Sequence, residues 1–353
     1  MINLWAPICD TGYGLASFNI LKQLDSVTKT ALYPIGKPFL ESTEDMGIVN
    51  KCLNNRDPYT KSTCIKIWHQ HDLYSRIGSG KYIGFPIFEL DSFDENEKMS
   101  LMHCDELFVC SDWAKGVILN NTKHKQENVH VVPLGVDSEI FNMSIVTARP
   151  TTIFFNCGKW SKNKGHDMLL KAFNAAFNYN DDVELWMMCD NLFIGDRNKE
   201  WQNLYKNSKL GDKVRFIPRQ PHHSDVARIM NMADCGIFPA RGEGWNMELL
   251  EMMACGKHVI ATNYSGHTEF CNKNNCKLID IKNLETAFDG VFFDGTKGFW
   301  AELSDDQVDQ TVAHMRDVHT KKQSNTLGIN VEGLKTARHF SWNFTLQNIM
   351  RYV

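Results

Sequence analysis

The residues most suited to chemistry form the stretch GEGWNMELLE at 242–251, in which two glutamates are separated by seven residues. Its glycines let the backbone approach a ligand closely. The amides of residues 245–247 are predicted to open a helix, and unpaired N–H groups at a helix N-terminus bind anions such as phosphate. Glu243 precedes this helix and Glu251 lies two turns inside it, so both can face one ligand. The alternative is a helix whose early glutamates only complement its dipole.

Further segments accompany this stretch along the chain in a fixed order. They are VVPLGVD at 131–137 with Phe141, NCGKWSKNKG at 156–165, ACGKHVIAT at 254–262 with Gly266 and Glu269, and FSW at 340–342. Together with the two glutamates they resemble glycosyltransferase family 4, the glycosyl transferases group 1, whose signature is E-x7-E. The resemblance covers nearly all of the chain and is weakest between residues 30 and 105.

The resemblance implies an α/β protein of the GT-B class, with two Rossmann-like, doubly wound domains that face a central cleft. Residues 1–148 would form the acceptor-side domain, residues 149–340 the nucleotide-sugar domain, and residues 341–353 a helix that crosses back to the first domain. The implied activity is that of a retaining, metal-independent glycosyltransferase. It moves a hexosyl or pentosyl group from a nucleoside-diphosphate sugar to an acceptor hydroxyl.

Carried over position by position, the resemblance also assigns the donor-binding residues. These are Gly12, Tyr13, Gly14, Lys159, Lys164, Arg219, Trp245, Asn246, Met247 and Glu251. Lys159 and Lys164 would neutralise the diphosphate as its charge develops during transfer. The family more often has Arg at the first of these positions, so Lys159 keeps the charge but loses the bidentate fork. Without the family context, both lysines would be read as solvent-exposed.

The sequence patterns that indicate the other donor contacts differ in how specific they are. Glu251 resembles the carboxylate that accepts hydrogen bonds from the donor ribose, and the amides of residues 245–247 would hold the sugar and the diphosphate. The DTGYG segment at 10–14 follows the first predicted strand, as the family's glycine-rich loop does, although it lacks the full dinucleotide-binding pattern. Arg219 lies at a strand end where such enzymes contact the base, and its role is a base or phosphate contact.

The catalytic residues implied are Glu243, His71 and Glu89. Glu243 resembles the carboxylate that contacts the hydroxyls of the transferred sugar. His71 and Glu89 end predicted strands of the first domain, where related enzymes place acceptor-binding groups, and they would orient or polarise the acceptor hydroxyl. A solvated loop is the alternative reading for these two residues.

No resident metal or cofactor is expected. The chain has no D-x-D triplet, the usual metal-binding element of GT-A enzymes, so the lysines and helix amides would replace the ion. Its 11 cysteines are scattered without a C-x-x-C, as in a cytosolic chain with reduced thiols. The group His267, Glu269, Cys271 and Cys276 has a spacing that matches no standard zinc site.

Short apolar runs alternate along the chain with segments of helical periodicity, as in α/β folds with parallel sheets. The strands and helices that they predict must position the residues named above. Leu15, Phe18, Leu21 and Leu24 predict one buried helix face, and Asp112 is predicted to cap a helix over 113–120. After a polar connection near residues 145–151, the pattern restarts. The strands predicted there are 152–157, 183–189, 214–218, 235–239 and 258–262, and the helices are 166–178, 198–208, 225–233 and 246–254.

Length and charge agree with two domains and a cytoplasmic protein. The 353 residues exceed what one hydrophobic core organises. Residues 1–148 carry a net charge of −5 and the rest +1, without the basic excess that phosphate binding to nucleic acid requires. No signal peptide or apolar run long enough for a membrane span is evident. The oligomeric state cannot be read from the sequence.

Several alternatives stay open at this point. A compact glycosyltransferase that modifies hydroxymethylated DNA bases would suit the short length, although the acidic first domain disfavours DNA. The acceptor is otherwise a glycan or another hydroxyl compound. A nucleotide-sugar epimerase and a non-catalytic sugar-nucleotide-binding protein are the other two readings, and both glutamates and both lysines argue against the second.

Overall fold

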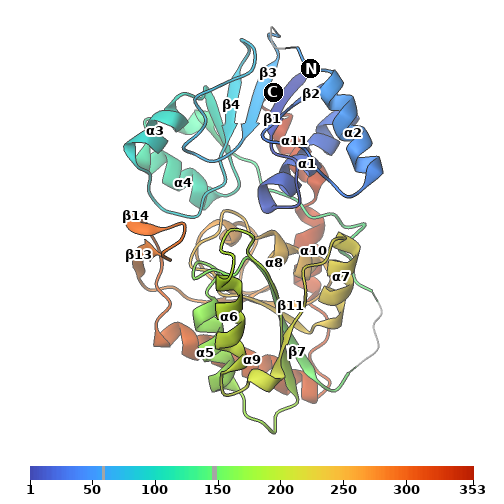
Figure 1. Ribbon diagram of the computed structural model, residues 1–353, viewed down its shortest axis with the longest axis vertical. Coiled ribbons are helices and arrows are strands. Elements are labelled where there is room, and N and C mark those ends of the chain that lie inside the picture. The colour runs from blue at the N-terminus through green and yellow to red at the C-terminus, as the bar shows by residue number, and fades with distance from the viewer. Residues whose placement is uncertain (58–59, 145–148) are drawn as a thin grey trace. The chain divides into compact units, whose positions relative to one another are not determined.

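The computed structural model describes residues 1–57, 60–144 and 149–353. The chain divides into two compact units, each built around its own parallel sheet (Figure 1). Unit 1 contains residues 1–135, 265–269 and 340–353, and unit 2 contains residues 136–264 and 270–339. The domain boundary predicted at residue 148 lies outside the described residues.

Unit 1 is a six-stranded parallel sheet in the order β2-β1-β3-β4-β5-β6. Its strands are β1 Ile2–Ala6, β2 Thr30–Pro34, β3 Thr63–Ile67, β4 Tyr82–Phe85, β5 Glu106–Val109 and β6 Val129–Val131. Its helices are α1 Gly12–Val27, α2 Thr43–Asn54, α3 Glu95–Met102, α4 Asp112–Asn121 and α11 Trp342–Ile349. Two 3-10 turns, η1 Gln126–Asn128 and η3 Gly266–Glu269, complete the unit.

Burial explains why these segments form the sheet and helices of unit 1. The central strands β3 and β4 are buried on both faces, as expected of parallel strands covered by helices. Of the predicted buried face of α1, Phe18, Leu21 and Leu24 are buried and Leu15 is half-buried. The predicted cap of α4 was wrong, because Asp112 is already helical. The extended residue before it, Ser111, accepts a hydrogen bond from the Ala114 amide through Oγ at 3.1 Å.

Unit 2 repeats the plan with the order β12-β11-β10-β7-β8-β9. Its sheet strands are β7 Thr152–Gly158, β8 Val183–Cys189, β9 Val214–Phe216, β10 Cys235–Phe238, β11 His258–Thr262 and β12 Lys277–Ile279. Its helices are α5 His166–Ala176, α6 Arg197–Lys206, α7 His223–Met232, α8 Met247–Ala254, α9 Asp305–Gln323 and α10 Val331–His339, with a 3-10 turn, η2 Gly211–Lys213. An antiparallel hairpin, β13 Leu284–Phe288 and β14 Asp294–Ala301, follows the sheet.

The core of unit 2 lies between the sheet and the helices α5 and α9. Phe154, Leu169, Phe173 and Met315 are buried in one cluster there. The helix α9 packs along α5, with Thr311 beside Met168 in the first turn of α5 and Arg316 donating to the Ala176 carbonyl at its end. Within the described part of the chain, none of the helices combines the length and apolar character that a membrane crossing requires.

Each sheet reverses its strand order at one point, and this determines where a ligand can bind. In open α/β sheets, ligands bind beyond the carboxyl ends of the strands on either side of such a switch point. In unit 1 these strands are β1 and β3, and in unit 2 they are β7 and β10. The relevant segments are therefore 7–11 and 68–72 in unit 1, and 159–165 and 239–246 in unit 2.

Candidate functional site

The switch point of unit 2 brings together a lysine and a glutamate that are far apart in the sequence. Lys164, in the loop after β7, and Glu243, in the loop after β10, form an ion pair with 2.7 Å between Nζ and Oε1. The Glu243 side chain is 6% exposed and that of Lys164 is 20% exposed. Because little water reaches these two side chains, each one holds the other in position. Removing either partner would leave the other charge uncompensated.

Two glycines shape the loop that carries Lys164. Gly158 at its start has φ 133° and Gly165 at its end has φ 72°, values that other residues rarely adopt. A Cβ on Gly165 would overlap the carbonyl oxygen of Pro239, so this glycine lets the loop pack directly against the end of β10. The amide of Arg241 donates to the carbonyl of Asn163 at 2.7 Å, and Asn163 Nδ2 donates to the carbonyl of Gly242 at 3.0 Å.

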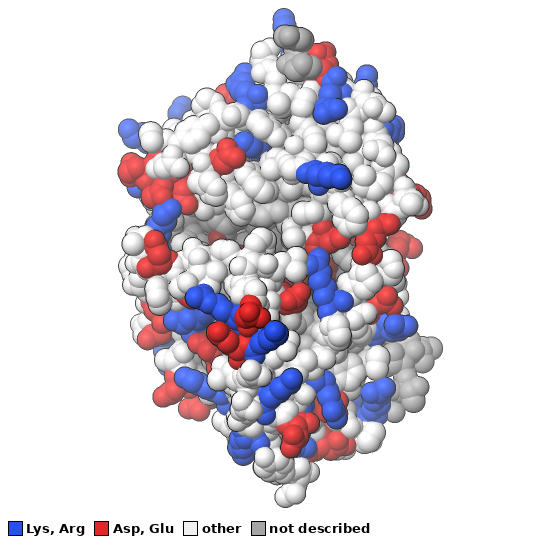
Figure 2. All heavy atoms as spheres, in the orientation of Figure 1, with Lys and Arg blue, Asp and Glu red and all other residues white. Residues whose placement is uncertain are grey.

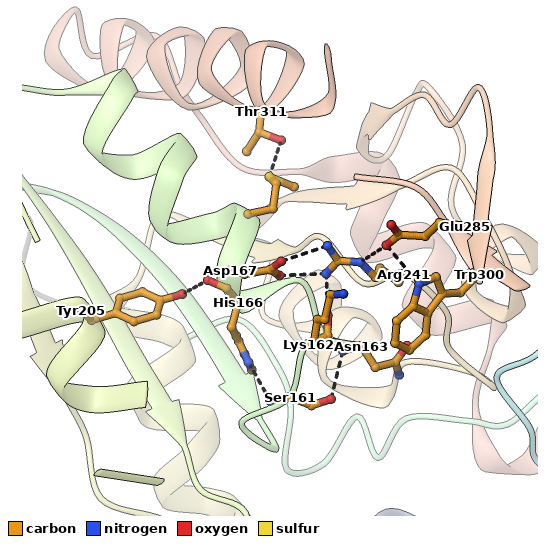
Figure 3. A network of polar contacts seen from close by, with 11 residues as sticks. Ser161, Lys162, Asn163, His166, Asp167, Tyr205, Arg241, Glu285, Trp300 and Thr311 are labelled. Atoms are coloured by element: carbon orange, nitrogen blue, oxygen red, sulfur yellow. Dashed lines mark hydrogen bonds and ion pairs between the residues drawn. The ribbon is translucent and has the colours of Figure 1, made fainter. Parts of the chain in front are cut away.

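The side chain of His166 holds the loop that carries Lys164 in place. Its Nδ1 accepts a hydrogen bond from the Ser161 amide at 3.1 Å, so Nε2 carries the proton and donates to Asn156 Oδ1 at 3.0 Å. Burial, followed by the charge of Lys164, lowers the pKa of His166 to about 3. The imidazole is therefore neutral at pH 7, and it links Asn156 of β7 to Ser161 of the loop, the second of which contacts Figure 3 shows.

The helix α8 begins one residue later than the sequence predicts. Asn246 is its N-cap, in the left-handed conformation with φ 79°, and its Oδ1 accepts from the Leu249 amide at 3.3 Å. Of the amides expected to open the helix, only that of Met247 is helical, and those of Trp245 and Asn246 precede it. The first-turn N–H groups still make this end of α8 a favourable place for an anion.

Glu251 and Glu248 add two carboxyl groups to the same helix. Glu251 is buried, and burial followed by the charge of Glu248 raises its pKa well above the usual range. A Cβ on Gly158 would lie 3.5 Å from Glu248 Oε1 and 4.0 Å from Lys164 Nζ, so these groups surround the end of β7. Glu248 was missed by sequence analysis, although its position one turn before Glu251 is a signal that could have found it.

Of the other donor residues predicted in unit 2, Lys159 and Arg219 are exposed and Trp245 is buried. Lys159 is exposed, and its Nζ lies 5.3 Å from the ring centre of Phe193. Trp245 is buried, with its ring centre 4.8 Å from that of Phe270. Arg219 is exposed in the segment between β9 and α7. The structure thus gathers Lys164, Glu243 and Glu251 at the switch point, and the contact predicted for Arg219 stays a prediction.

In unit 1, an aromatic group occupies the switch point between β1 and β3. The ring of Tyr13 lies 5.7 Å from that of Trp68 and 4.7 Å from that of His69. The Tyr13 hydroxyl donates to the Ile87 carbonyl at 2.6 Å and accepts from the Ile87 amide at 3.0 Å. Burial raises the pKa of this hydroxyl, so it stays protonated at neutral pH.

The glycines beside Tyr13 differ in their surroundings. Gly12 is exposed, with no atom within 4 Å of an added Cβ. A Cβ on Gly14 would overlap the backbone of Cys9, so this residue must be small for α1 to start so close to the loop after β1. Packing alone therefore explains Gly14, and only Gly12 is placed where a ligand could approach it.

The predicted acceptor residues follow β3 and β4. His71 is exposed and stacks on His69, with 5.4 Å between ring centres and 12° between planes. Glu89 is half-buried, and its charge contributes to the raised pKa of Tyr13. Both predicted side chains therefore lie near the same aromatic group. Their roles toward an acceptor stay predictions.

The described residues contain no group of three or more His, Cys, Asp or Glu side chains arranged to hold a metal ion. Cys271 and Cys276, from the stretch with metal-like residue types, are both buried and hydrogen-bonded to each other. On the face drawn in Figure 2, the basic and acidic side chains of the described residues are intermixed.

Residues 141–289 match the model of the family described as glycosyl transferases group 1, and the match includes Lys164, Glu243 and Glu251. Over this segment the chain is similar to the glycosyl transferases group 1. The family resemblance predicted from the sequence is thus confirmed. Most of the matched segment is unit 2, the unit that holds the lysine and glutamate pair.

The curated relatives of this chain are distant. A D-inositol 3-phosphate glycosyltransferase of Paenarthrobacter aurescens is 24% identical over 229 residues, which cover 62% of this chain and 50% of the relative. A mannosylfructose-phosphate synthase of Agrobacterium fabrum is 22% identical over 200 residues, which cover 51% of this chain and 43% of the relative. The chain therefore spans about half the length of these relatives.

Solved structures resemble this chain over nearly its whole length. Anabaena HepE, solved in complex with UDP and glucose, has a TM-score of 0.69 at 14% identity and covers 99% of this chain and 98% of its own. The sucrose-phosphate synthase of Thermosynechococcus elongatus has a TM-score of 0.73 at 13% identity, with coverage of 99% and 97%. These similarities confirm the predicted fold, GT-B with two Rossmann-like α/β domains.

Proposed function

We propose that this protein transfers a sugar from a nucleoside-diphosphate sugar to an acceptor hydroxyl, with retention of the anomeric configuration. The observation that carries the proposal is the ion pair of Lys164 and Glu243 at the switch point of unit 2, beside the N-terminus of α8. A cation for a diphosphate and a carboxylate for sugar hydroxyls are thus held at one place. The group 1 family match over the same residues supports it.

The proposed reaction breaks the bond between the sugar C1 and the diphosphate oxygen, whose electron pair stays on the diphosphate. The acceptor oxygen forms the new bond to C1 from the same face, and its proton passes to the departing diphosphate. Lys164, Lys159 and the amides at the start of α8 would stabilise the charge that develops on the diphosphate. Glu243 would bind hydroxyls of the transferred sugar and Glu251 those of the ribose.

In this proposal no divalent cation is needed, because the two lysines and the helix dipole supply the positive charge. No resident cofactor is proposed either, and the nucleotide sugar is a co-substrate. His71 and Glu89 of unit 1 are proposed to orient the acceptor hydroxyl, which belongs to a glycan or a similar polyol. Anabaena HepE was solved with UDP-glucose, which makes UDP-sugars the first donors to test.

The donor is tested with a panel of UDP-glucose, UDP-galactose, UDP-N-acetylglucosamine, GDP-mannose and ADP-glucose. The true donor should raise the melting temperature, since a ligand at about 100 times its dissociation constant stabilises the folded state by about 2.7 kcal/mol. It should also release its nucleoside diphosphate slowly to water in the absence of an acceptor, with EDTA present. If no donor in the panel binds or turns over, the proposal is wrong.

The site assignment is tested with Lys164→Ala and Glu243→Gln. Each should lower nucleoside-diphosphate release by about 100-fold or more, because each removes a group that stabilises the transition state. Lys171→Ala is the control, since this lysine is exposed on α5. Full activity in both site variants would refute the assignment. The anomeric configuration of a product, read by proton NMR, tests retention.

A further inference from the structure

One buried arginine connects the parts of unit 2 that carry the ion pair. Arg241 precedes Glu243 by two residues, and its side chain is 4% exposed. Its guanidinium donates to Asp167 from both terminal nitrogens, at 2.7 and 2.9 Å, and to the Lys162 carbonyl at 2.7 Å. Its Nε donates to Glu285 Oε1 at 2.7 Å (Figure 3).

These contacts reach three separate pieces of the chain. Lys162 lies in the loop that presents Lys164, Asp167 lies in the first turn of α5, and Glu285 lies in β13 of the hairpin. The backbone adds to the connection, because the Arg241 amide donates to Asn163 and its carbonyl accepts from the Ala301 amide at 2.8 Å. One residue therefore ties the Lys164 loop and the hairpin to the strand end that presents Glu243.

The hairpin supplies Glu285, a carboxylate that is already oriented toward Arg241 by a second hydrogen bond. Trp300 of β14 is fully buried, and its Nε1 donates to the same Glu285 oxygen at 3.1 Å. The ring of Trp300 lies 5.9 Å from the Arg241 guanidinium carbon. Glu285 is thus held by two donors, and it can be oriented toward Arg241 only while β13 and β14 are paired.

The buried charge of Arg241 explains why the network needs both Asp167 and Glu285. A guanidinium that is almost fully buried is stable only beside negative charge, and Asp167 and Glu285 provide it. The pKa of Asp167 is lowered, because the hydrogen bonds and charge of Arg241 outweigh the effect of burial. A lysine could not replace the arginine fully, since it lacks the planar fork that reaches both carboxylates at once.

We propose that Arg241, held by Glu285 of the hairpin, is the positioning residue that fixes the Lys164 loop against the Glu243 loop. Arg241 acts through the backbone of residues 162 and 163, whose carbonyls accept hydrogen bonds from its guanidinium and its amide. The hairpin, which sequence analysis did not predict, becomes part of the donor-site machinery. The kinetic part of this inference depends on the proposed function, whereas the structural part does not.

The structural part is tested by hydrogen exchange on the full chain. Arg241→Met should accelerate amide exchange in residues 161–166 and 241–247 by about tenfold or more, while β7 and β8 keep their protection. Arg241→Lys and Glu285→Gln should give smaller effects on the same segments, and they serve if Arg241→Met fails to fold. The control is Lys322→Met, which breaks a partly buried ion pair, 2.8 Å long, with Asp234 near the start of β10.

The kinetic part uses nucleoside-diphosphate release from the donor that the wild type accepts. Arg241→Met should lower kcat/KM by about 10- to 100-fold, because a displacement of about 1 Å at a reacting group costs that much. Lys322→Met should change it less than about twofold. Unchanged exchange in the two loops, or a kinetic loss no larger than in the control, would overturn the inference. A wild type without turnover would refute the proposed function, and the exchange data would still decide the position of the loops.

Discussion

At the scale of single residues, the proposed donor site is built from groups that compensate one another's charge. Lys164 and Glu243 neutralise each other at 2.7 Å, and His166 is kept neutral by burial and by the nearby lysine. A diphosphate would take Lys164 as a partner and leave Glu243 to accept from sugar hydroxyls. The pair thus keeps both side chains oriented for the separate partners that the proposed function gives them.

Glu251 gives a prediction about pH. Its folded-state pKa is raised, so the folded protein binds more protons than the unfolded chain above about pH 4.3, and stability falls as the pH rises from there toward the raised value. Glu251→Gln should therefore be more stable than the wild type at pH 8 and nearly equal at pH 4.5. It should also weaken donor binding by about tenfold, since the carboxyl group proposed to bind the ribose hydroxyls is replaced.

The measurement is chemical unfolding of Glu251→Gln and wild type at both pH values, with donor affinity from titration. Glu248→Gln is a useful comparison, because Glu248 is half-buried on the same helix. A stability difference that does not change with pH would contradict the prediction.

His166 gives a prediction of the opposite sign. Its folded-state pKa of about 3 lies below the unfolded value of about 6.5, so its contribution is fully present above pH 6.5 and is lost as the pH falls toward 3. The free energy of unfolding should fall in this window by up to about 1.4 kcal/mol per pH unit. Urea unfolding between pH 7 and pH 4.5 should show a shallower dependence in His166→Gln. Parallel curves for the two proteins would refute the assignment.

At the scale of elements, segments buried on both faces could be predicted from the sequence. The bounds of β8 and β11 were predicted correctly, because each is an apolar run with polar residues at its ends. The helix α2 was not predicted, and only Val49 and Cys52 in it are buried. The hairpin β13 and β14 was missed for the same reason, since most of its residues are exposed and give no alternating apolar pattern.

The sequence predicts those parts of the candidate site that are formed by residues close together along the chain. The glycines and glutamates of 242–251 indicate a ligand loop by their own spacing. The network of Arg241 could not be found in this way, because Asp167 and Glu285 reach it from distant parts of the chain. The early start expected for α8 failed because Asn246 adopts a left-handed conformation that its residue type permits but does not require.

Gly165 gives a prediction at this scale. Gly165→Ala should cost about 1–2 kcal/mol for the left-handed conformation and about 1–3 kcal/mol more for the overlap with Pro239. Gly195→Ala is the matched control, because Gly195 also has a positive φ, 52°, but no atom lies within 4 Å of an added Cβ. Thermal unfolding should rank the wild type first, Gly195→Ala second and Gly165→Ala last. Equal losses in the two variants would show that the loop does not pack as described.

At the scale of the whole molecule, the family match and the charge both divide the chain unevenly. Residues 141–289, mostly in unit 2, match the glycosyl transferases group 1, whereas the net charge of −5 belongs to residues 1–148. The donor chemistry proposed for unit 2 is therefore supported by its sequence, its geometry and its similarity to this family. The proposed acceptor chemistry is assigned to unit 1. Its support is the role predicted for His71 and Glu89 and the acidic charge of residues 1–148.

The charge of that half predicts which acceptors will not bind. A protein that holds DNA through its phosphates needs several Lys and Arg side chains on one face, and its affinity then falls steeply with salt. Here the half that includes the acceptor residues is acidic, and on the face drawn in Figure 2 the charges of both signs are intermixed. Hydroxymethylated duplex DNA should therefore show no gel retardation, even at about 20 mM salt where phosphate contacts are strongest. Neutral oligosaccharides should instead increase nucleoside-diphosphate release from the true donor. Retardation that disappears with rising salt would contradict this prediction, because it would show that the protein binds DNA through its phosphates.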